Sequence, residues 1–281
     1  FGSSQIVSEL VIMKTQLPTL FVPHGAPTFS LRPGAAGAAL AEIASSLHRP
    51  RAIVIVSPHW ETELPTVGHA ERLATIHDFY GFPQELYELS YPASGCPEGA
   101  REVTAAIAAA GLPVRDVNSS GLDHGAWVPL RLMYPDADVP VIPVSLQSHG
   151  GGTQAYRLGE ALAPLVSQGF LIIGSGNITH NLRDYMIARQ NGGQTPDYVR
   201  DFPDWMAKRL QDGDLDALMH YRELAPGARN AHPTDEHLLP LYVALGAAGK
   251  DASVHRFHAG ISDYVLAMDA YSFSPAFSPK H

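Results

Sequence analysis

Short apolar runs alternate with helical patterns along the first two thirds of the chain. Four runs are apolar and largely β-branched, at residues 18–22, 52–56, 139–146 and 170–173. Strands that are buried on both faces have this character. Three segments between them follow helical patterns, at residues 35–48, 97–110 and 154–167. Strands that alternate with helices build a mostly parallel sheet flanked by helices, so the pattern predicts an α/β fold.

The pattern changes in the last third of the chain. Residues 197–221 are mostly helical, and a further helix is expected over 234–248. Residues 254–258 and 264–268 are apolar runs that we interpret as an antiparallel edge hairpin. Residues 61–94 have no clear period, and segments of this length are usually functional lids or contain short strands.

Two of the predicted strands end in the same way. The run Ala52–Val56 is followed by Ser57-Pro58, and the next side chain is His59. Proline has no amide hydrogen for the ladder, so the strand is expected to stop there. The run at 18–22 likewise leads into Pro23-His24-Gly25. Both strands belong to one strand–helix–strand unit, whose right-handed crossover makes them parallel and brings His24 and His59 to the same edge of the sheet.

Length and composition indicate one domain. The 281 residues are 45% hydrophobic and 17% charged, typical of a globular protein. No internal repeat or linker divides them, and we expect residues 13–281 to form a single domain. Phe1-Gly2-Ser3-Ser4 looks foreign and Met13-Lys14 reads as a natural start, so residues 1–12 are interpreted as an expression remnant and left out of the fold prediction.

Charge and cysteine content narrow the partners and the compartment. The net charge of −9 argues against nucleic acid or an anionic membrane as the main partner. No apolar run approaches the roughly 20 residues of a membrane span. A lone cysteine, Cys96, excludes an internal disulfide and fits a reducing cytosol. We therefore expect a cytoplasmic protein whose partners are small molecules, with the oligomeric state left open.

Histidines at strand ends and turns are the candidate chemical groups. Of the 14 histidines, His24, His59, His124 and His180 follow predicted strands or turns, and His237 lies at a predicted helix start. Neutral imidazole is a good ligand for zinc and iron. No compact zinc motif is present, because a site assembled from distant strand ends has no local spacing. Taken together, these residues predict a metal site.

Several nearby residues have alternative interpretations. Glu236 is either a metal ligand or a first-turn glutamate that satisfies free helix amides. On a helix Glu236 and His237 would point about 100° apart, so we expect only one of them to bind the ion. The run Gly174-Ser175-Gly176-Asn177 is no phosphate loop and is interpreted as a close backbone approach to a ligand. Six histidines are interpreted as surface or structural: His69, His77, His149, His220, His255 and His258.

Five segments together resemble a known family. They are Pro23-His24-Gly25-Ala26-Pro27, Ser57-Pro58-His59-Trp60, Leu122-Asp123-His124-Gly125-Ala126-Trp127, Gly174-Ser175-Gly176-Asn177-Ile178-Thr179-His180-Asn181 and His232-Pro233-Thr234-Asp235-Glu236-His237-Leu238-Leu239-Pro240. In this order they resemble the DOPA-dioxygenase branch of the LigB-type class III extradiol ring-cleavage dioxygenases. The resemblance runs from about residue 18 to residue 268.

The resemblance implies a metal, a reaction and roles for particular residues. It implies one α/β domain that uses non-haem Fe(II) and O2 to open a substituted catechol such as DOPA beside its diol, with zinc often bound on purification. It implies that His24 and His59 are ligands. In the protocatechuate-cleaving relatives the third ligand is a glutamate. The resemblance to the DOPA branch implies a histidine at this position instead, which favours His237 over Glu236. His180 matches the acid–base histidine, and His124 is expected to touch substrate.

Two other functions compete with this one. A zinc-dependent hydrolase could use the same scaffold, and a non-catalytic metal-binding relative could keep the fold without the reaction. The complete set of histidines disfavours the second. Zinc has no redox chemistry, so the metal requirement distinguishes the dioxygenase from the hydrolase.

Overall fold

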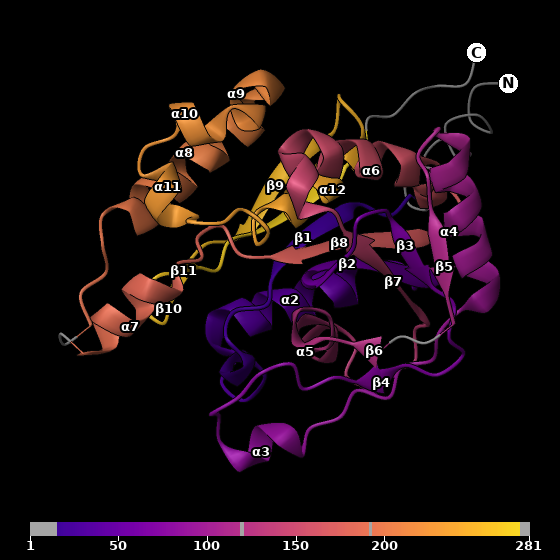
Figure 1. Ribbon diagram of the computed structural model, residues 1–281, viewed down its shortest axis with the longest axis horizontal. Coiled ribbons are helices and arrows are strands. Elements are labelled where there is room, and N and C mark those ends of the chain that lie inside the picture. Colours follow the sequence, from indigo (N-terminus) through magenta and orange to yellow (C-terminus); the bar gives the residue numbers. More distant parts are fainter. Residues whose placement is uncertain (1–15, 119–120, 191–192, 276–281) are drawn as a thin grey trace, which may run out of the picture.

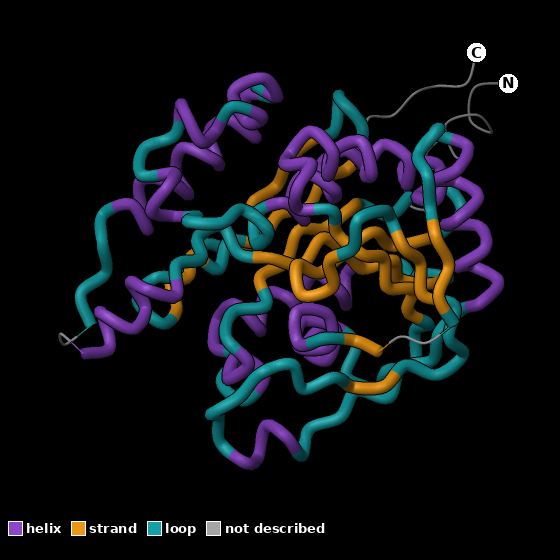
Figure 2. The backbone as a smooth tube through the Cα atoms, viewed as in Figure 1, coloured by secondary structure: helices purple, strands orange, loops and turns teal. Residues whose placement is uncertain are grey.

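A computed structural model describes residues 16–118, 121–190 and 193–275. The predicted remnant at residues 1–12 lies outside the described residues. The main feature is an eight-stranded sheet with the strand order β5-β3-β7-β2-β8-β1-β12-β9, and helices cover both of its faces (Figures 1 and 2). The α/β prediction with a central, mostly parallel sheet is confirmed.

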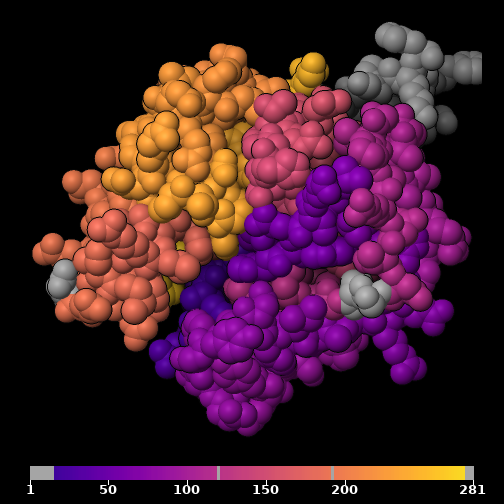
Figure 3. All heavy atoms as spheres, in the orientation of Figure 1, coloured from indigo at the N-terminus to yellow at the C-terminus, as the bar shows by residue number. Residues whose placement is uncertain are grey.

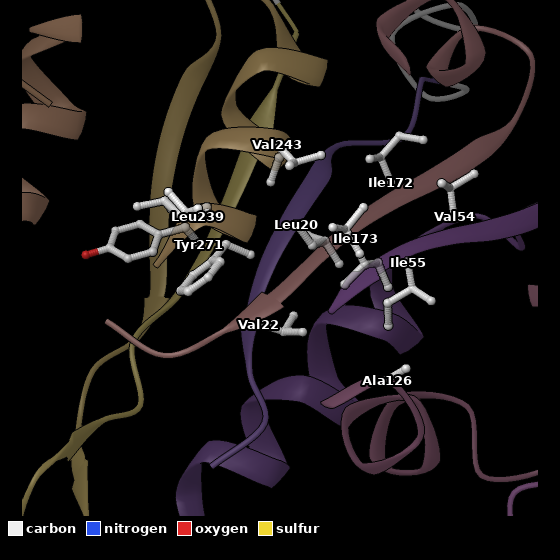
Figure 4. Close-up of a cluster of buried hydrophobic side chains, with 14 of the residues drawn as sticks. Leu20, Val22, Val54, Ile55, Ala126, Ile172, Ile173, Leu239, Val243 and Tyr271 are labelled. Atoms are coloured by element: carbon white, nitrogen blue, oxygen red, sulfur yellow. The ribbon is translucent and has the colours of Figure 1, made fainter. Parts of the chain in front are cut away.

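Four parallel strands form the centre of this sheet. They are β7 (Val141–Leu146), β2 (Ala52–Glu61), β8 (Phe170–Gly176) and β1 (Thr19–Pro23). Every residue of β1, β7 and β8 is buried. Side chains from neighbouring strands meet in the core, where Leu20 lies opposite Ile173 (Figure 4). The apolar runs thus form buried strands because both faces of the sheet are covered.

Helices pack on the two faces of the sheet. One face carries α2 (Gly34–Ser46) and α5 (His124–Met133), which pack against each other. The opposite face carries α4 (Pro97–Ala109), α6 (Gly151–Val166) and α12 (Leu239–Ala248) (Figure 1). In Figure 4, Val243 of α12 and Ala126 of α5 approach the central strands from opposite sides. The carboxyl ends of β1, β2 and β8 lie between these layers, at the edge where the candidate histidines were expected.

The remaining elements are short or lie at the periphery. In the loops they are two 3₁₀ turns at Pro27–Ser30 and Ser148–Gly150, strands β3 (Thr66–Gly68), β4 (Ala74–Thr75), β5 (Arg115–Val117) and β6 (Gly121–Leu122), and helix α3 (Gln84–Tyr87). A helical lobe contains α7 (Leu182–Gln190), α8 (Tyr198–Asp212), α9 (Leu215–Met219), α10 (Tyr221–Leu224) and α11 (Ala228–Ala231). In Figure 3 this orange lobe and the purple segment that follows β2 lie on either side of indigo atoms from the start of the chain. Among the helices of the described residues, none combines the length and apolar character that crossing a membrane requires.

The antiparallel edge exists, but its second strand was misplaced. β9 (Ser253–His258) pairs with β12 (Ala270–Ser274), which in turn pairs with β1. The predicted strand at 264–268 contains only β11 (Leu266–Ala267), which pairs with β10 (Ile261–Ser262). The side chain of Thr179 binds this segment instead, since its hydroxyl donates to Val265 O at 2.6 Å and accepts from Ala267 N at 2.8 Å. These contacts use backbone groups that a strand would have offered to a neighbour.

Proline does not end β2, contrary to the prediction. The strand continues through Pro58 to Glu61, and β7 likewise continues through Pro143. The ladder to β8 stops at Val56, however, and the ladder to β7 jumps from Ser57 to Glu61. Pro58 therefore occupies an irregular stretch in which no ladder bond needs its missing amide hydrogen. His59 lies in the same stretch, where its backbone is free of regular pairing.

The helix expected from residue 234 starts later. Residues 233–238 form bends and turns, and α12 begins at Leu239 with Pro240 in its first turn. Proline is well tolerated at this position because the first amides of a helix have no intrahelical partner. His237 therefore precedes the helix rather than starting it. The helical angle between Glu236 and His237 that we expected to separate the two side chains does not apply.

Candidate metal centre and adjoining cavity

His24, His59 and His237 come together from three different parts of the fold. His24 follows β1, His59 lies in the irregular end of β2, and His237 lies in the turns before α12. One ring nitrogen from each lies within 4.8 Å of the other two. The Nε2 atoms of His24 and His59 are 3.4 Å apart. Two nitrogens that bind one tetrahedral ion at the usual bond length are also about 3.4 Å apart, so the spacing fits a metal.

The Nδ1 atom of His24 is held by a hydroxyl group. It lies 3.1 Å from Ser175 Oγ, and that hydroxyl donates its own hydrogen to Gly125 O. Ser175 can therefore only accept from His24, so Nδ1 carries the ring proton and Nε2 presents a lone pair to the cluster. Hydrogen bonds of this kind orient metal-binding histidines and fix their tautomer.

Carboxylates face Nδ1 of the other two histidines. Glu236 Oε1 lies 3.0 Å from Nδ1 of His237, and Asp78 Oδ2 lies 3.5 Å from Nδ1 of His59. Nε2 of His237 is buried and has no hydrogen-bond partner among the described residues. Buried polar atoms usually have a partner. Three ring nitrogens that converge in this way are a donor set for a cation, and a borderline divalent metal fits this set.

Burial keeps these imidazoles neutral. Desolvation, followed by the neighbouring histidines, lowers the pKa of His24 and His237 well below the usual value. The same causes lower the pKa of His59 to about 3. A metal ligand must be unprotonated, so the site is in its binding form at neutral pH.

Glycines in β8 allow the segment that carries His237 to pack directly against the strand. A Cβ atom at Gly176 would lie 2.2 Å from His237 O, and one at Gly174 would lie 2.0 Å from Pro240 O. Asn177 N donates to His237 O at 2.9 Å. The glycine-rich run was expected to let the backbone pass close to a ligand. It passes close to the chain itself, and the segment that carries His237 rests directly on the strand.

Asp78 is a site residue that the sequence reasoning missed. Its Oδ1 accepts from His124 N at 2.8 Å, and its Oδ2 lies 2.9 Å from Nδ1 of His124. The same carboxylate faces His59, so it orients both rings, whose centroids are 4.0 Å apart. The available signal was the sequence His77-Asp78-Phe79 inside a long segment without period. Asp78 leaves Nε2 of His124 free to contact a ligand.

Asp78→Asn should lower turnover by about 10- to 100-fold, as is typical for partners that orient metal-site histidines. The amide would offer a donor where the His124 and His59 rings need an acceptor, so His124 would change tautomer or turn. The measurement is kcat of the metal-loaded variant together with its metal content. Asp116→Asn is the matched control, because Asp116 bonds His69 at 2.9 Å outside the cluster. Full turnover at full metal content in Asp78→Asn would contradict this role.

His180 stacks on His237. The two rings are 3.5 Å apart between centroids and nearly parallel, at 6°. His180 N donates to Ala231 O at 2.8 Å, which ties the turn after β8 to the segment before α12. Burial lowers the pKa of His180 to about 4, so the ring is neutral and can accept a proton at neutral pH. One nitrogen or oxygen atom from each of His180, Glu236 and His237 lies within 4.8 Å of the other two, so these residues could also hold an ion.

His232 contacts the turn that follows β8. It is fully buried, and its Nε2 lies 2.7 Å from Ile178 O. Nε2 therefore carries the proton and donates to that carbonyl. Burial lowers the pKa of His232 to about 3. Sequence reasoning included His232 only within a motif, because nothing in the local pattern shows that its ring is buried.

Acid should destabilise the metal-free protein through His232. The unfolded chain takes up a proton as the pH falls through about 6.5, whereas the folded protein resists protonation until about pH 3. Stability is therefore lost as the pH falls across this window, by about 1.4 kcal/mol per pH unit for each such histidine. His232→Gln should reduce that slope by about one proton, measured by urea unfolding between pH 7 and pH 5. Above pH 7.5 the two curves should run parallel, and identical slopes below pH 6.5 would contradict this assignment.

A cavity of about 300 Å³ opens beside the histidines. Its polar wall is formed by five of them: His24, His59, His124, His180 and His237. Apolar side chains also line the cavity, among them Phe79, Phe82, Val265 and Leu266. Small-ligand sites usually combine such an apolar lining with a few convergent polar groups. The cavity suits a flat aromatic molecule whose polar edge faces the three converging nitrogens.

Other histidines lie away from this cavity. His69 bonds Asp116, His77 donates to Leu89 O at 3.0 Å, and Nδ1 of His220 lies 2.9 Å from Asp216 O. The structural interpretation of these three agrees with their contacts. All five histidines expected at the site meet in one place.

Comparisons with known proteins show the family to which the chain belongs. Residues 30–269 match the model of the catalytic LigB subunit of aromatic ring-opening dioxygenase. A 4,5-DOPA dioxygenase extradiol of Beta vulgaris is 39% identical over 264 residues, which cover 91% of this chain and 96% of that protein. A protein of the same name from Escherichia coli strain K12 is 36% identical over 251 residues, covering 86% and 89% of the two chains.

A solved structure shares the fold. A crystal structure of an uncharacterised protein from Escherichia coli K12 superposes with a TM-score of 0.75 at 28% sequence identity. The match covers 92% of this chain and 99% of that one. The similarity therefore extends over nearly the whole fold.

Proposed function

The chain belongs to the LigB family of aromatic ring-opening dioxygenases, and from this premise we propose a substrate, a metal and a role for each site residue. The proposed reaction is extradiol cleavage of a substituted catechol such as DOPA, with O2 as the second substrate. The observation that carries the proposal is the convergence of three histidine ring nitrogens at the polar edge of an aromatic-sized cavity.

We assign the metal-binding role to His24, His59 and His237. Three protein ligands would leave other positions of the ion open for substrates, as the two-histidine, one-carboxylate set does in other non-haem iron oxygenases. Fe(II), when bound there, supplies the redox chemistry that couples O2 to the catechol. Glu236 acts by holding Nδ1 of His237. Zinc fits the same nitrogens but has no redox chemistry, so zinc-loaded protein is expected to be inactive.

The other two histidines handle the substrate's protons and oxygens. His180 is neutral and faces the cavity, so a ring nitrogen accepts a proton from the catechol hydroxyl and later returns one to the opening product. His124, oriented by Asp78, points its free nitrogen at the substrate. Phe79 and Leu266 contact the ring and exclude water. Holding the ring in one orientation lowers the entropic barrier to reaction.

The choice of catechol rests on the relatives. Several proteins that are 35–39% identical over most of the chain carry the name 4,5-DOPA dioxygenase extradiol. DOPA is therefore the first substrate to test, and caffeate and other substituted catechols are the next.

Oxygen consumption tests the proposal. The protein is stripped of metal with a chelator, reloaded anaerobically with Fe(II) or Zn²⁺, and mixed with DOPA in an oxygen electrode. Fe(II)-loaded protein should consume one O2 per catechol and form a coloured ring-opened product, whereas the zinc form should consume none. Hydrolysis of ester or amide substrates by the zinc form, with no oxygen uptake by the iron form, would favour the hydrolase instead.

A further inference from the structure

A second, larger cavity adjoins the catechol-sized one. It measures about 770 Å³, and Phe82 and Tyr185 line both cavities. The inner cavity ends in the histidine cluster, while the outer one opens between α7, the loop at 80–85 and the turn at 262–264. A ring bound at the histidines would therefore extend any substituent past Phe82 and Tyr185 into the outer cavity.

The outer cavity carries charges of both signs. Arg32 and Arg189 supply positive charge, and Glu85 and Asp263 supply negative charge. Within residues 16–118, 121–190 and 193–275, none of these four side chains takes part in a salt bridge, whereas other arginines in the protein do. Charged side chains of both signs that face one cavity without pairing are available to a ligand that carries charge itself.

Arg189 lines the outer cavity and contacts Tyr185, which lines both cavities. Its Nη1 donates to Tyr185 Oη at 3.2 Å, and the centre of its guanidinium lies 5.6 Å from the Tyr185 ring centroid. This contact uses one of five N–H donors and leaves the others for a carboxylate. A guanidinium that is fixed in place loses less entropy when it binds an anion in a bidentate manner.

Asp263, an acidic residue of the outer cavity, lies in a constrained turn. Asp263 and Tyr264 both have left-handed backbones, with φ of 49° and 68°. The Tyr264 ring packs against Gly193, where a Cβ atom would lie 2.2 Å from Tyr264 Cε1. Ser262 Oγ donates to Asp263 Oδ2 at 2.9 Å. Unusual backbone of this kind persists where the surrounding contacts hold it, so the Asp263 carboxylate has a defined position.

We propose that the outer cavity is a specificity site for the substituent of the catechol. In it Arg189, assisted by Arg32, binds a carboxylate, and Asp263, assisted by Glu85, binds an ammonium group. The site thereby selects catechols that carry a zwitterionic amino-acid tail over those with a neutral or singly charged tail. This inference rests on the proposed binding of a catechol at the histidines.

Four catechols separate the two charges of the tail. DOPA has both charges, 3-(3,4-dihydroxyphenyl)propionate has only the carboxylate, dopamine has only the ammonium, and 4-methylcatechol has neither. Arg189→Met should raise KM about tenfold for the two carboxylate-bearing catechols, because a charge-assisted hydrogen bond is lost. KM for dopamine and 4-methylcatechol should stay unchanged. Arg189→Lys keeps the charge without the planar fork and should fall between wild type and Arg189→Met.

Two further variants complete the design. Asp263→Asn should raise KM for DOPA and dopamine but not for the other two, and asparagine tolerates the left-handed backbone at this position. Arg183→Met is the matched control, because Arg183 lies on the same helix as Arg189 but lines neither cavity. It should leave all four KM values unchanged.

Direct binding separates this inference from the proposed reaction. Calorimetric titration of the zinc-loaded protein with the four catechols gives affinities without turnover. If Arg189→Met weakens all four catechols equally, or none of them, the specificity site is refuted even when Fe(II)-loaded protein still opens 4-methylcatechol. If no catechol is opened but Arg189→Met still weakens the carboxylate-bearing ligands selectively, the reaction fails and the binding site stands.

Discussion

Replacing His59 with alanine is expected to remove most of the bound metal and, with it, ring opening. The change deletes one of three nitrogens that converge within 4.8 Å. Two neutral imidazoles hold an ion far more weakly than three, so the loss of affinity should exceed the 10- to 100-fold typical of outer partners. Metal content after dialysis, measured by mass spectrometry, and oxygen uptake with DOPA are the readouts. His149→Ala, an exposed histidine outside the cluster, is the matched control.

His59 is the best of the three ligands for this test. Its side chain is 23% exposed, and Asp78 keeps its two hydrogen bonds to His124 when the ring is removed. The variant should therefore fold normally, as circular dichroism and thermal unfolding can show. His24 is 1% exposed and holds Ser175, so His24→Ala should lose metal with some loss of stability as well. Full metal content in both variants would place the site elsewhere.

Replacing His180 with alanine should leave metal and catechol binding largely intact and lower turnover by about 10² to 10⁴, the usual contribution of a positioned acid–base group. The ring lies against His237 but is not one of the three proposed ligands. His180→Gln should behave similarly, because an amide can hydrogen-bond but cannot carry a proton near neutral pH. Anaerobic catechol titration gives binding, and single-turnover oxygen kinetics give the chemical step.

A purely structural role for His180 makes a different prediction. The ring packs the turn after β8, and its backbone amide binds Ala231 O whatever the side chain is. If packing is the whole role, His180→Ala loses stability, while the folded fraction turns over at a near-normal rate. That result would remove His180 from the mechanism and make His124 the next candidate for proton transfer.

The meeting of His24 and His59 could be predicted because it follows from chain topology. Both lie at the ends of strands in one strand–helix–strand unit, and a right-handed crossover makes such strands parallel. In the structure β8 lies between β1 and β2, yet the parallel direction still brings both histidines to one edge. The parallel sheet was predictable for the same reason, since buried β-branched runs have few alternatives.

Asp78 could not be predicted because its role depends on tertiary contacts alone. It lies in a long segment without period, and its partners His59 and His124 are placed by other elements. The start of α12 was misplaced for a similar reason. Glu236 was interpreted as a possible first-turn glutamate, but in the structure it bonds His237 in a turn before the helix. The strand expected at 264–268 is mostly absent, because the Thr179 hydroxyl hydrogen-bonds the backbone groups of Val265 and Ala267.

The pairing of β1 with β12 affects the order in which the site can be completed during synthesis. Thr19 lies opposite Phe273, so the strand that leads to His24 gains its second neighbour only after almost the whole described chain has been made. The hydrogen bond from Asn177 N, just after β8, to His237 O also forms only after residue 237 has been synthesised. A ribosome-bound chain that ends before β12 would leave one side of β1 unpaired, next to an unfinished metal site. Metal loading is therefore expected to follow synthesis of β12, and a pulse of labelled metal should mark chains that contain β12 rather than shorter nascent ones.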